Sequence, residues 1–257
     1  MYMQKYDLSG RTALVTGGAR NIGLACTLAL AEAGARPVVA DLTEELVASG
    51  CDALARAGYA AEGLVLDVTD PDAVTAAADR LNADGAAVDI LVCNAGIARS
   101  DVPAEEVTDE HWRNVIDINL NGVFWSCRAF GRHMLARRAG AIVTVGSMSG
   151  FIVNKPQPQS YYNASKAAVH HLTRSLAAEW AERGVRVNAV APTYIETSLT
   201  RFGMEDPRMY PVWLENTPMR RVGQPDEIAS VVLFLASDAA SLMTGSIVLA
   251  DGGYTCW

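Results

Sequence analysis

The chain of 257 residues is long enough for one large α/β domain, and half of its residues are apolar, which is sufficient for a sizeable core. A formal net charge of −8 argues against binding to nucleic acid or to anionic membrane surfaces. We therefore expect a soluble protein that handles a small molecule, with no nucleic-acid partner and no membrane partner.

The sequence also indicates where the protein works. Its first ten residues contain no apolar core of a signal peptide, and apolar runs such as 231–236 are too short to span a bilayer. Five cysteines are scattered without metal-ligand or redox spacing, and we interpret them as free thiols in a reducing cytoplasm, with Cys93 and Cys127 as core residues.

Short β-rich runs alternate with longer, periodic runs rich in Ala and Leu along the whole chain. The predicted strands cover residues 12–16, 37–41, 60–66, 89–93, 141–146, 186–191 and 246–250. The predicted helices cover residues 22–33, 43–57, 71–81, 111–136, 162–182 and 226–236. Because the strands are apolar on both faces, they are typical of a parallel sheet between two helix layers. The pattern predicts a single domain over residues 1–257, with an α/β, Rossmann-like, doubly wound fold, a seven-stranded parallel sheet and helices on both faces.

The regular alternation fails once, between about Pro192 and Gln224, where three prolines and Trp213 lie. A long irregular insertion in a compact domain is usually functional. Since this one follows the end of a strand, we expect residues 193–223 to form a lid over a ligand.

A glycine-rich turn at 16–23 follows the first predicted strand and opens the first helix. Glycines let the backbone approach a pyrophosphate, and the helix N-terminus favours the anion. Asp41, at the end of the second strand, can hydrogen-bond a ribose and would repel a 2′-phosphate, which predicts NAD over NADP. Arg20 favours the opposite preference, because its side chain could bind the 2′-phosphate of NADP. The structural alternative for Asp41 is a helix cap, which Thr43 could supply instead.

Two further strand ends carry candidate ligand contacts. Asp67 and Val68 end the third strand, and Asn94, Ala95 and Gly96 end the fourth. Ligands of open α/β sheets bind outside the carboxyl ends of the strands, where an adenine contact and a close-approach turn are needed. Taken singly, both could be ordinary strand-exit turns.

Tyr162 and Lys166 stand one helical turn apart, so they share a helix face. A fixed ammonium beside a phenol favours the phenolate and lowers the tyrosine pKa toward a value useful in general acid/base chemistry. Tyr and Lys at this spacing also occur on many surface helices. Tyr161 is a rival for Tyr162, but only Tyr162 lies four residues before Lys166.

With Asn119, Ser147 and residues 192–197, these motifs give the chain a resemblance to the short-chain dehydrogenase/reductase family over essentially its whole length. Residues 146–150, 152–154 and 251–257 resemble the bacterial polyol dehydrogenases of that family. The chain departs from the family where Asn21 replaces the middle glycine of the turn and where Thr193 replaces the glycine after Pro192. Asn tolerates the left-handed backbone that such a turn needs.

The resemblance implies four catalytic residues. Tyr162 exchanges the proton of the alcohol, and Ser147 orients the substrate oxygen. Lys166 lowers the Tyr162 pKa and holds the nicotinamide ribose, and Asn119 positions a water that links Lys166 to solvent. From the residues alone, Ser147 could instead be a turn cap and Asn119 could satisfy local backbone by making a kink.

The resemblance also implies the binding residues. The predicted cofactor set is Gly17, Arg20, Asn21, Ile22, Gly23, Asp41, Asp67, Val68, Asn94, Ala95, Gly96, Tyr162, Lys166, Pro192, Ile195 and Thr197. The predicted substrate contacts are Ser147, Ser149, Asn154 and Tyr162, with Gln157 and Gln159 as further polar groups that could equally belong to a surface loop. Neutral donors and acceptors suit a polyol or ketose. The predicted function is NAD-dependent interconversion of a polyol's secondary alcohol and the ketone.

Two alternatives stay open from the sequence: a 3-oxoacyl-carrier or other secondary-alcohol reductase of the same family, and a catalytically silent nucleotide sensor on this fold. The resemblance further implies a homotetramer in which the helices over 111–136 and 162–182 form a dimer interface. It also suggests a structural Mg²⁺ held by the terminal carboxylate of Trp257.

Overall fold

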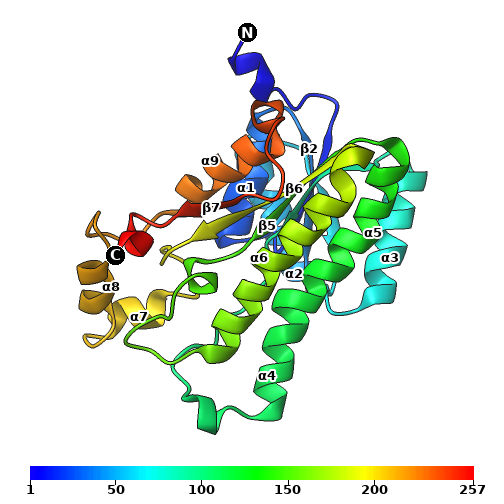
Figure 1. Ribbon diagram of the computed structural model, residues 1–257. Helices are drawn as coiled ribbons and strands as arrows, with labels where there is room; N and C mark the ends of the chain where they lie inside the picture. Colours follow the sequence, from blue (N-terminus) through cyan, green and yellow to red (C-terminus); the bar gives the residue numbers. More distant parts are fainter.

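The computed structural model describes residues 1–257 and contains one parallel sheet with the strand order β3-β2-β1-β4-β5-β6-β7 (Figure 1). Its strands are β1 (Thr12–Thr16), β2 (Arg36–Asp41), β3 (Glu62–Val65), β4 (Val88–Cys93), β5 (Gly140–Val145), β6 (Val185–Pro192) and β7 (Ile247–Ala250). The predicted Rossmann-like α/β fold with seven parallel strands is confirmed. The strand order reverses between β1 and β4, which is where doubly wound folds bind their ligands.

Helices cover both faces of the sheet (Figure 1). One face carries α1 (Asn21–Glu32), α2 (Glu44–Arg56) and α9 (Pro225–Ala236). The other carries α3 (Pro71–Ala83), α4 (Asp109–Ile116), α5 (Gly122–Arg137) and α6 (Ser160–Trp180). The strand period of two explains the two cores: Leu14 packs in the core under α3, α5 and α6, while its neighbours Ala13 and Val15 pack under α1 and α9.

The predicted helix over 111–136 is wrong as one continuous element. It is interrupted between α4 and α5 by a single π-helical stretch, η3 (Asp117–Asn121). Asn119 lies in this wider turn and is fully buried. Its Oδ1 accepts the Ile97 N–H at 2.9 Å, and its Nδ2 donates to Ile97 O at 2.8 Å and to Ser165 Oγ at 3.1 Å. Such insertions into helices are frequent at functional sites.

Residues 193–223 contain two short helices that the sequence pattern did not indicate, α7 (Arg201–Glu205) and α8 (Tyr210–Asn216). The C-terminal segment lies beside them (Figure 1), and Gly253 comes so close to Pro218 that an added Cβ would lie 2.8 Å from Pro218 Cγ. The irregular segment is therefore packed against the chain end.

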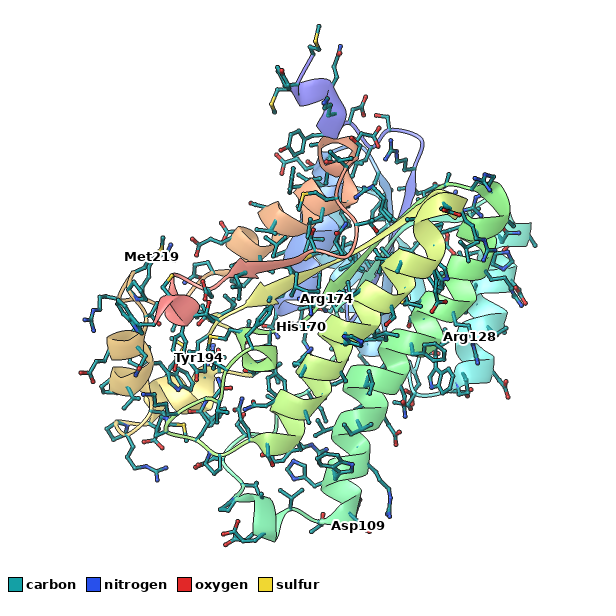
Figure 2. The ribbon with its side chains drawn as sticks, viewed as in Figure 1. Asp109, Arg128, His170, Arg174, Tyr194 and Met219 are labelled. Carbon is teal, nitrogen blue, oxygen red and sulfur yellow. The ribbon has the colours of Figure 1, made fainter.

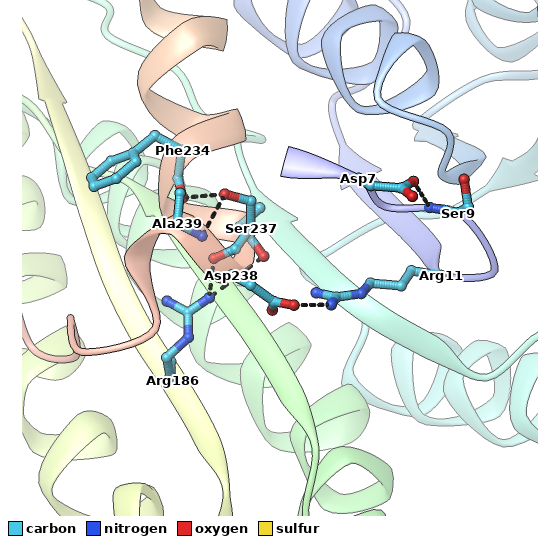
Figure 3. A network of polar contacts seen from close by, with 9 residues as sticks. Asp7, Ser9, Arg11, Arg186, Phe234, Ser237, Asp238 and Ala239 are labelled. Carbon is cyan, nitrogen blue, oxygen red and sulfur yellow. Dashed lines mark hydrogen bonds and ion pairs between the residues drawn. The ribbon is translucent and has the colours of Figure 1, made fainter. Parts of the chain in front are cut away.

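The amino edge of the sheet is closed by polar contacts (Figure 3). The Arg186 guanidinium, at the start of β6, donates to Leu235 O at 2.9 Å and Ser237 O at 3.0 Å, which lie at the end of α9. Arg11, just before β1, pairs with Asp238 at 2.6 Å. The Arg186 bonds satisfy carbonyls at the end of α9.

All five cysteines are free. Cys93 and Cys127 belong to the core, as predicted, with their sulfurs 3.8 Å apart. None of the helices combines the length and the apolar character required to cross a membrane.

Candidate active site

A cavity of about 350 Å³ opens at the carboxyl edge of the sheet, and residues from the ends of β1, β4, β5 and β6 line it. All predicted cofactor-binding residues line this cavity, from Gly17 in the glycine turn to Thr197 after β6. Ser147, Ser149 and Asn154 line it too. Asn119 and Trp257 do not line the cavity. Asn119 is fully buried outside it, and Trp257 is exposed at the chain end.

The glycine turn is built around a close backbone approach. A Cβ added at Gly23 would lie 1.9 Å from Gly17 O and 2.6 Å from Asn94 Nδ2. Asn94 Nδ2 donates to Thr16 O at 3.0 Å and to Gly17 O at 2.9 Å, so the end of β4 holds the turn in place. The turn thus presents its backbone to the cavity, which is what a pyrophosphate requires. A dinucleotide fits this cradle.

Asn21 occupies the position of the family's middle glycine and adopts a left-handed φ of 51°. Its side chain reaches across the cavity to the irregular segment. The amide Nδ2 donates to Ser198 Oγ at 2.9 Å, and its Oδ1 accepts the Ser198 N–H at 3.4 Å. The departure from glycine therefore adds a clasp between the glycine turn and residues 193–223.

Asp41 lies at the end of β2 and is only 8% exposed. Its carboxylate accepts the Ala19 N–H at 3.2 Å and the Leu42 N–H at 2.9 Å. Thr43 caps α2 by accepting the Leu46 N–H at 3.3 Å, so the cap does not need Asp41. The carboxylate is anchored to the glycine turn and borders the cavity.

The two neighbouring tyrosines have different environments. Tyr162 lines the cavity. Tyr161 does not, and its buried hydroxyl donates to Arg99 O at 2.5 Å. The structure therefore favours Tyr162 as the candidate acid/base group.

The charge states of Tyr162 and Lys166 correct the expectation from sequence. Lys166 Nζ lies 5.7 Å from the Tyr162 ring centre and donates to Val145 O at 2.8 Å. Burial lowers the Lys166 pKa to about 8. Burial also raises the Tyr162 pKa, and a hydrogen bond with Ser147 only partly opposes this. The predicted lowering of the Tyr162 pKa is thus wrong for the protein alone, since desolvation of the phenolate outweighs its favourable contacts.

The buried Lys166 predicts a pH-dependent stability difference. Its folded pKa of about 8 lies below the unfolded 10.5, so between these values the unfolded chain binds more protons and the free energy of unfolding rises with pH. Relative to Lys166→Met, the wild type should gain about 2 kcal/mol between pH 7 and pH 10. Urea unfolding of both proteins at the two pH values measures this gain. A pH-independent difference would contradict the assigned burial of the charge.

Ser147 is a turn cap that also borders the cavity. Its Oγ accepts the Ser149 N–H at 3.1 Å, which caps the short helix η4 (Met148–Gly150). The same hydroxyl donates to Ser149 Oγ at 3.1 Å and borders the cavity. The cap holds the hydroxyl at the site.

Sequence reasoning missed a polar and aromatic cluster beside Asn154. The rings of Tyr194 and Trp213 stack with centres 3.9 Å apart. Trp213 Nε1 donates to Gln157 Oε1 at 3.1 Å, and Gln157 Nε2 donates to the Tyr194 hydroxyl, also at 3.1 Å. Figure 2 labels Tyr194 between β6 and the segment that carries α8. The sequence signal was the aromatic residue inside the irregular segment, but its hydrogen-bond partner Gln157 comes from a distant loop.

The residues near the chain end do not form a metal site by themselves. No group of three or more His, Cys, Asp or Glu is arranged to hold a metal ion, and Trp257 is 76% exposed. The Mg²⁺ at the terminal carboxylate stays a prediction, and no step below depends on it.

A family model and several known enzymes are similar to this chain over almost its whole length. The family model described as enoyl-(acyl carrier protein) reductase matches residues 17–255. The galactitol 2-dehydrogenase of Rhizobium johnstonii is 57% identical over 256 residues, and the L-tagatose-forming galactitol 2-dehydrogenase of Cereibacter sphaeroides is 52% identical over the same length. Each match covers 100% of this chain and 99% of the relative.

Solved structures are similar along the full chain. The crystal structure of gox2181 has a TM-score of 0.98 and 59% identity, with 100% of both chains covered. A gluconate 5-dehydrogenase from Burkholderia cenocepacia J2315, in complex with NADP and tartrate, has a TM-score of 0.95 and 37% identity, again with 100% of both chains covered. The chain belongs to the short-chain dehydrogenase/reductase family, as its motifs predicted, and is an oxidoreductase that uses an NAD(P) cofactor on secondary alcohols.

Proposed function

We propose that the protein is an NAD-dependent dehydrogenase that interconverts a secondary alcohol of a polyol and the ketone of the corresponding ketose. The observation that carries the substrate class is a pair of buried polar atoms without a partner in the chain, Asn154 Oδ1 and Thr193 Oγ1. Both residues line the cavity. A buried polar atom left unpaired costs about 1–3 kcal/mol, and the hydroxyl groups of a polyol can pair with both.

The orientation of the Asn154 amide supports a hydroxyl-bearing substrate. Its Nδ2 donates to the Tyr194 hydroxyl at 2.9 Å, and Tyr194 is in turn held by Gln157 and Trp213. The amide oxygen of Asn154 is thereby left as an acceptor. An acceptor needs a donor, so a substrate hydroxyl suits this position and an aliphatic chain does not.

The proposed mechanism follows from three side chains. Tyr162 takes the proton from the substrate hydroxyl, or returns it to the carbonyl in the reverse direction. Ser147 hydrogen-bonds the same oxygen and keeps it beside Tyr162, while the Lys166 ammonium gives the site a positive charge. The nicotinamide supplies the hydride chemistry, and the cation of its oxidised form favours the phenolate. Asn119 is proposed to connect Lys166 to solvent through a water, since both side chains lie within 4 Å of a Cβ added at Gly96.

The NAD preference rests on Asp41. A buried carboxylate at the end of β2 can accept hydrogen bonds from the ribose hydroxyls and repels a 2′-phosphate. Two backbone N–H groups hold it there, so it cannot swing away without losing both bonds. Arg20 also lines the cavity and is the group that would favour NADP.

The proposal extends to the setting of the enzyme. The galactitol 2-dehydrogenases, at 52% to 57% identity, support a polyol substrate. We expect residues 193–223 to act as a lid on this single domain, because the clasp from Asn21 to Ser198 joins them to the cofactor turn. The proposal also includes a cytoplasmic location, a homotetrameric assembly and a Mg²⁺ ion at the terminal carboxylate of Trp257. Light scattering measures the assembly, and its repetition with a chelator tests whether the ion contributes to it.

A substrate screen tests the proposed function. Galactitol, sorbitol, xylitol, short diols and a secondary mono-alcohol of equal chain length are oxidised with NAD and with NADP, and an acyl thioester is offered for reduction. We expect polyols with NAD to exceed the mono-alcohol in kcat/KM by about 10- to 100-fold, the cost of leaving a buried acceptor unpaired. Asn154→Leu should remove that advantage and leave the mono-alcohol rate unchanged. Activity confined to the thioester would contradict the polyol assignment.

A further inference from the structure

We propose that His170 is a positioning residue for the reaction. Its imidazole packs against the turn at 146–151 and holds Ser147 beside Tyr162. The inference rests on the proposed function only in that Ser147 must orient the substrate oxygen. None of the sequence motifs includes His170, and it does not line the cavity.

His170 lies on the same face of α6 as the candidate catalytic pair. It follows Lys166 by four residues and Tyr162 by eight, so all three project toward the same side of the helix. The side chain is 3% exposed. Figure 2 places it on the side of α6 that faces the end of β5, with Arg174 further along the helix.

The ring fits a space that glycines leave open. A Cβ added at Gly146 would lie 2.4 Å from the His170 Nε2, and one added at Gly150 would lie 2.4 Å from its Cε1. The Phe151 ring closes a third side, with the two ring centres 4.6 Å apart. The turn that carries Ser147 therefore wraps around this imidazole, and its path depends on the ring.

The contact to Ser147 is a hydrogen bond from its backbone N–H to the imidazole side chain. The Gly146 N–H is held by Val190 O on the neighbouring strand at 2.8 Å. The next amide, that of Ser147, is past the end of β5 and donates to His170 Nε2 at 3.4 Å. A buried N–H needs an acceptor, and His170 provides one at the residue whose hydroxyl faces the substrate.

This role requires an uncharged ring, since a protonated imidazole has no acceptor nitrogen. Burial lowers the His170 pKa to about 4, and the charged groups that act on it, Lys166 and Arg174, are both cations that oppose protonation further. The ring is thus neutral at pH 7. Its Nδ1 has no partner in the chain, so the only polar contact of the ring is the one to Ser147.

The test compares variants at two adjacent histidines. His170→Phe keeps a ring but removes the acceptor, His170→Gln restores an acceptor, and His171→Phe changes the exposed neighbour on the same helix. Each is assayed with the alcohol that the wild type oxidises best, whatever its class, so failure of the polyol assignment does not affect the result. Thermal unfolding and NAD affinity are measured in parallel.

For His170→Phe we expect kcat to fall by about 10²-fold, as for a misplaced reacting group, with NAD affinity unchanged. His170→Gln should recover at least part of that loss, and His171→Phe should match the wild type. If His170→Phe does not fold, His170→Leu replaces it in the same comparison.

A double-mutant cycle separates positioning from general packing. If His170 acts through Ser147, the His170→Phe change should lower kcat far less in a Ser147→Ala background than in the wild type. The proposal is overturned if the two losses are equal, if His170→Phe is as active as His171→Phe, or if His170→Gln is no better than His170→Phe.

Discussion

Tyr162→Phe is expected to lower kcat for alcohol oxidation by about 10²- to 10⁴-fold, the usual contribution of a general acid/base. The phenol lines the cavity, while the Lys166 ammonium beside it is tied to a backbone carbonyl and cannot readily take its place. NAD affinity should be retained, because only the hydroxyl is removed. Steady-state kinetics and a fluorescence titration with NAD measure the two effects.

Tyr161→Phe is the matched control. This change also removes one phenolic hydroxyl on the same helix, but that hydroxyl bonds to Arg99 O and lies outside the cavity. Turnover should stay near that of the wild type. Equal losses of turnover for the two variants would contradict the assignment of Tyr162 as the acid/base group. Full turnover by Tyr162→Phe would mean that another group exchanges the proton of the alcohol.

Gly23→Ala is expected to weaken NAD binding by about 10- to 100-fold, because overpacking of this kind costs about 1–3 kcal/mol. The added Cβ would lie 1.9 Å from Gly17 O, so the turn has to open. Opening would also disturb the bond from Asn94 Nδ2 to Gly17 O. Calorimetric titration with NAD gives the affinity, and thermal unfolding shows how much of the loss reflects stability.

Gly58→Ala controls for the loss of a glycine elsewhere. A Cβ at Gly58 meets nothing within 4 Å, although its φ of 90° makes the substitution mildly strained. We expect a small drop in stability and unchanged NAD affinity. The explanation by close approach fails if Gly23→Ala binds NAD as tightly as Gly58→Ala does.

The sequence located the cofactor side of the site well, because its signals are local. The glycine turn, Asp41 and the residues after β4 each follow a strand end, and parallel strands bring their carboxyl ends to one edge. Those residues accordingly line a single cavity. Whether each performs its assigned role stays a prediction.

The sequence was less informative where a helix changes its pitch or a side chain meets a distant loop. The periodicity of residues 111–136 is compatible with one helix, and the π-helical turn at Asn119 adds one residue without breaking the apolar pattern. The stacking of Tyr194 on Trp213 depends on the path of residues 193–223, which no periodic pattern describes.

The order of motifs along the chain determined the fold and the family, since strand and helix periods and the spacing of Tyr162 and Lys166 are local properties of the sequence. Only the tertiary structure decided the electrostatics. The pKa of Tyr162 is raised rather than lowered, because burial of the phenol outweighs its hydrogen bond with Ser147. It also decided that His170 meets Ser147, because the glycines that make room for the ring follow β5 while the ring itself lies on α6, and only packing brings the two elements together.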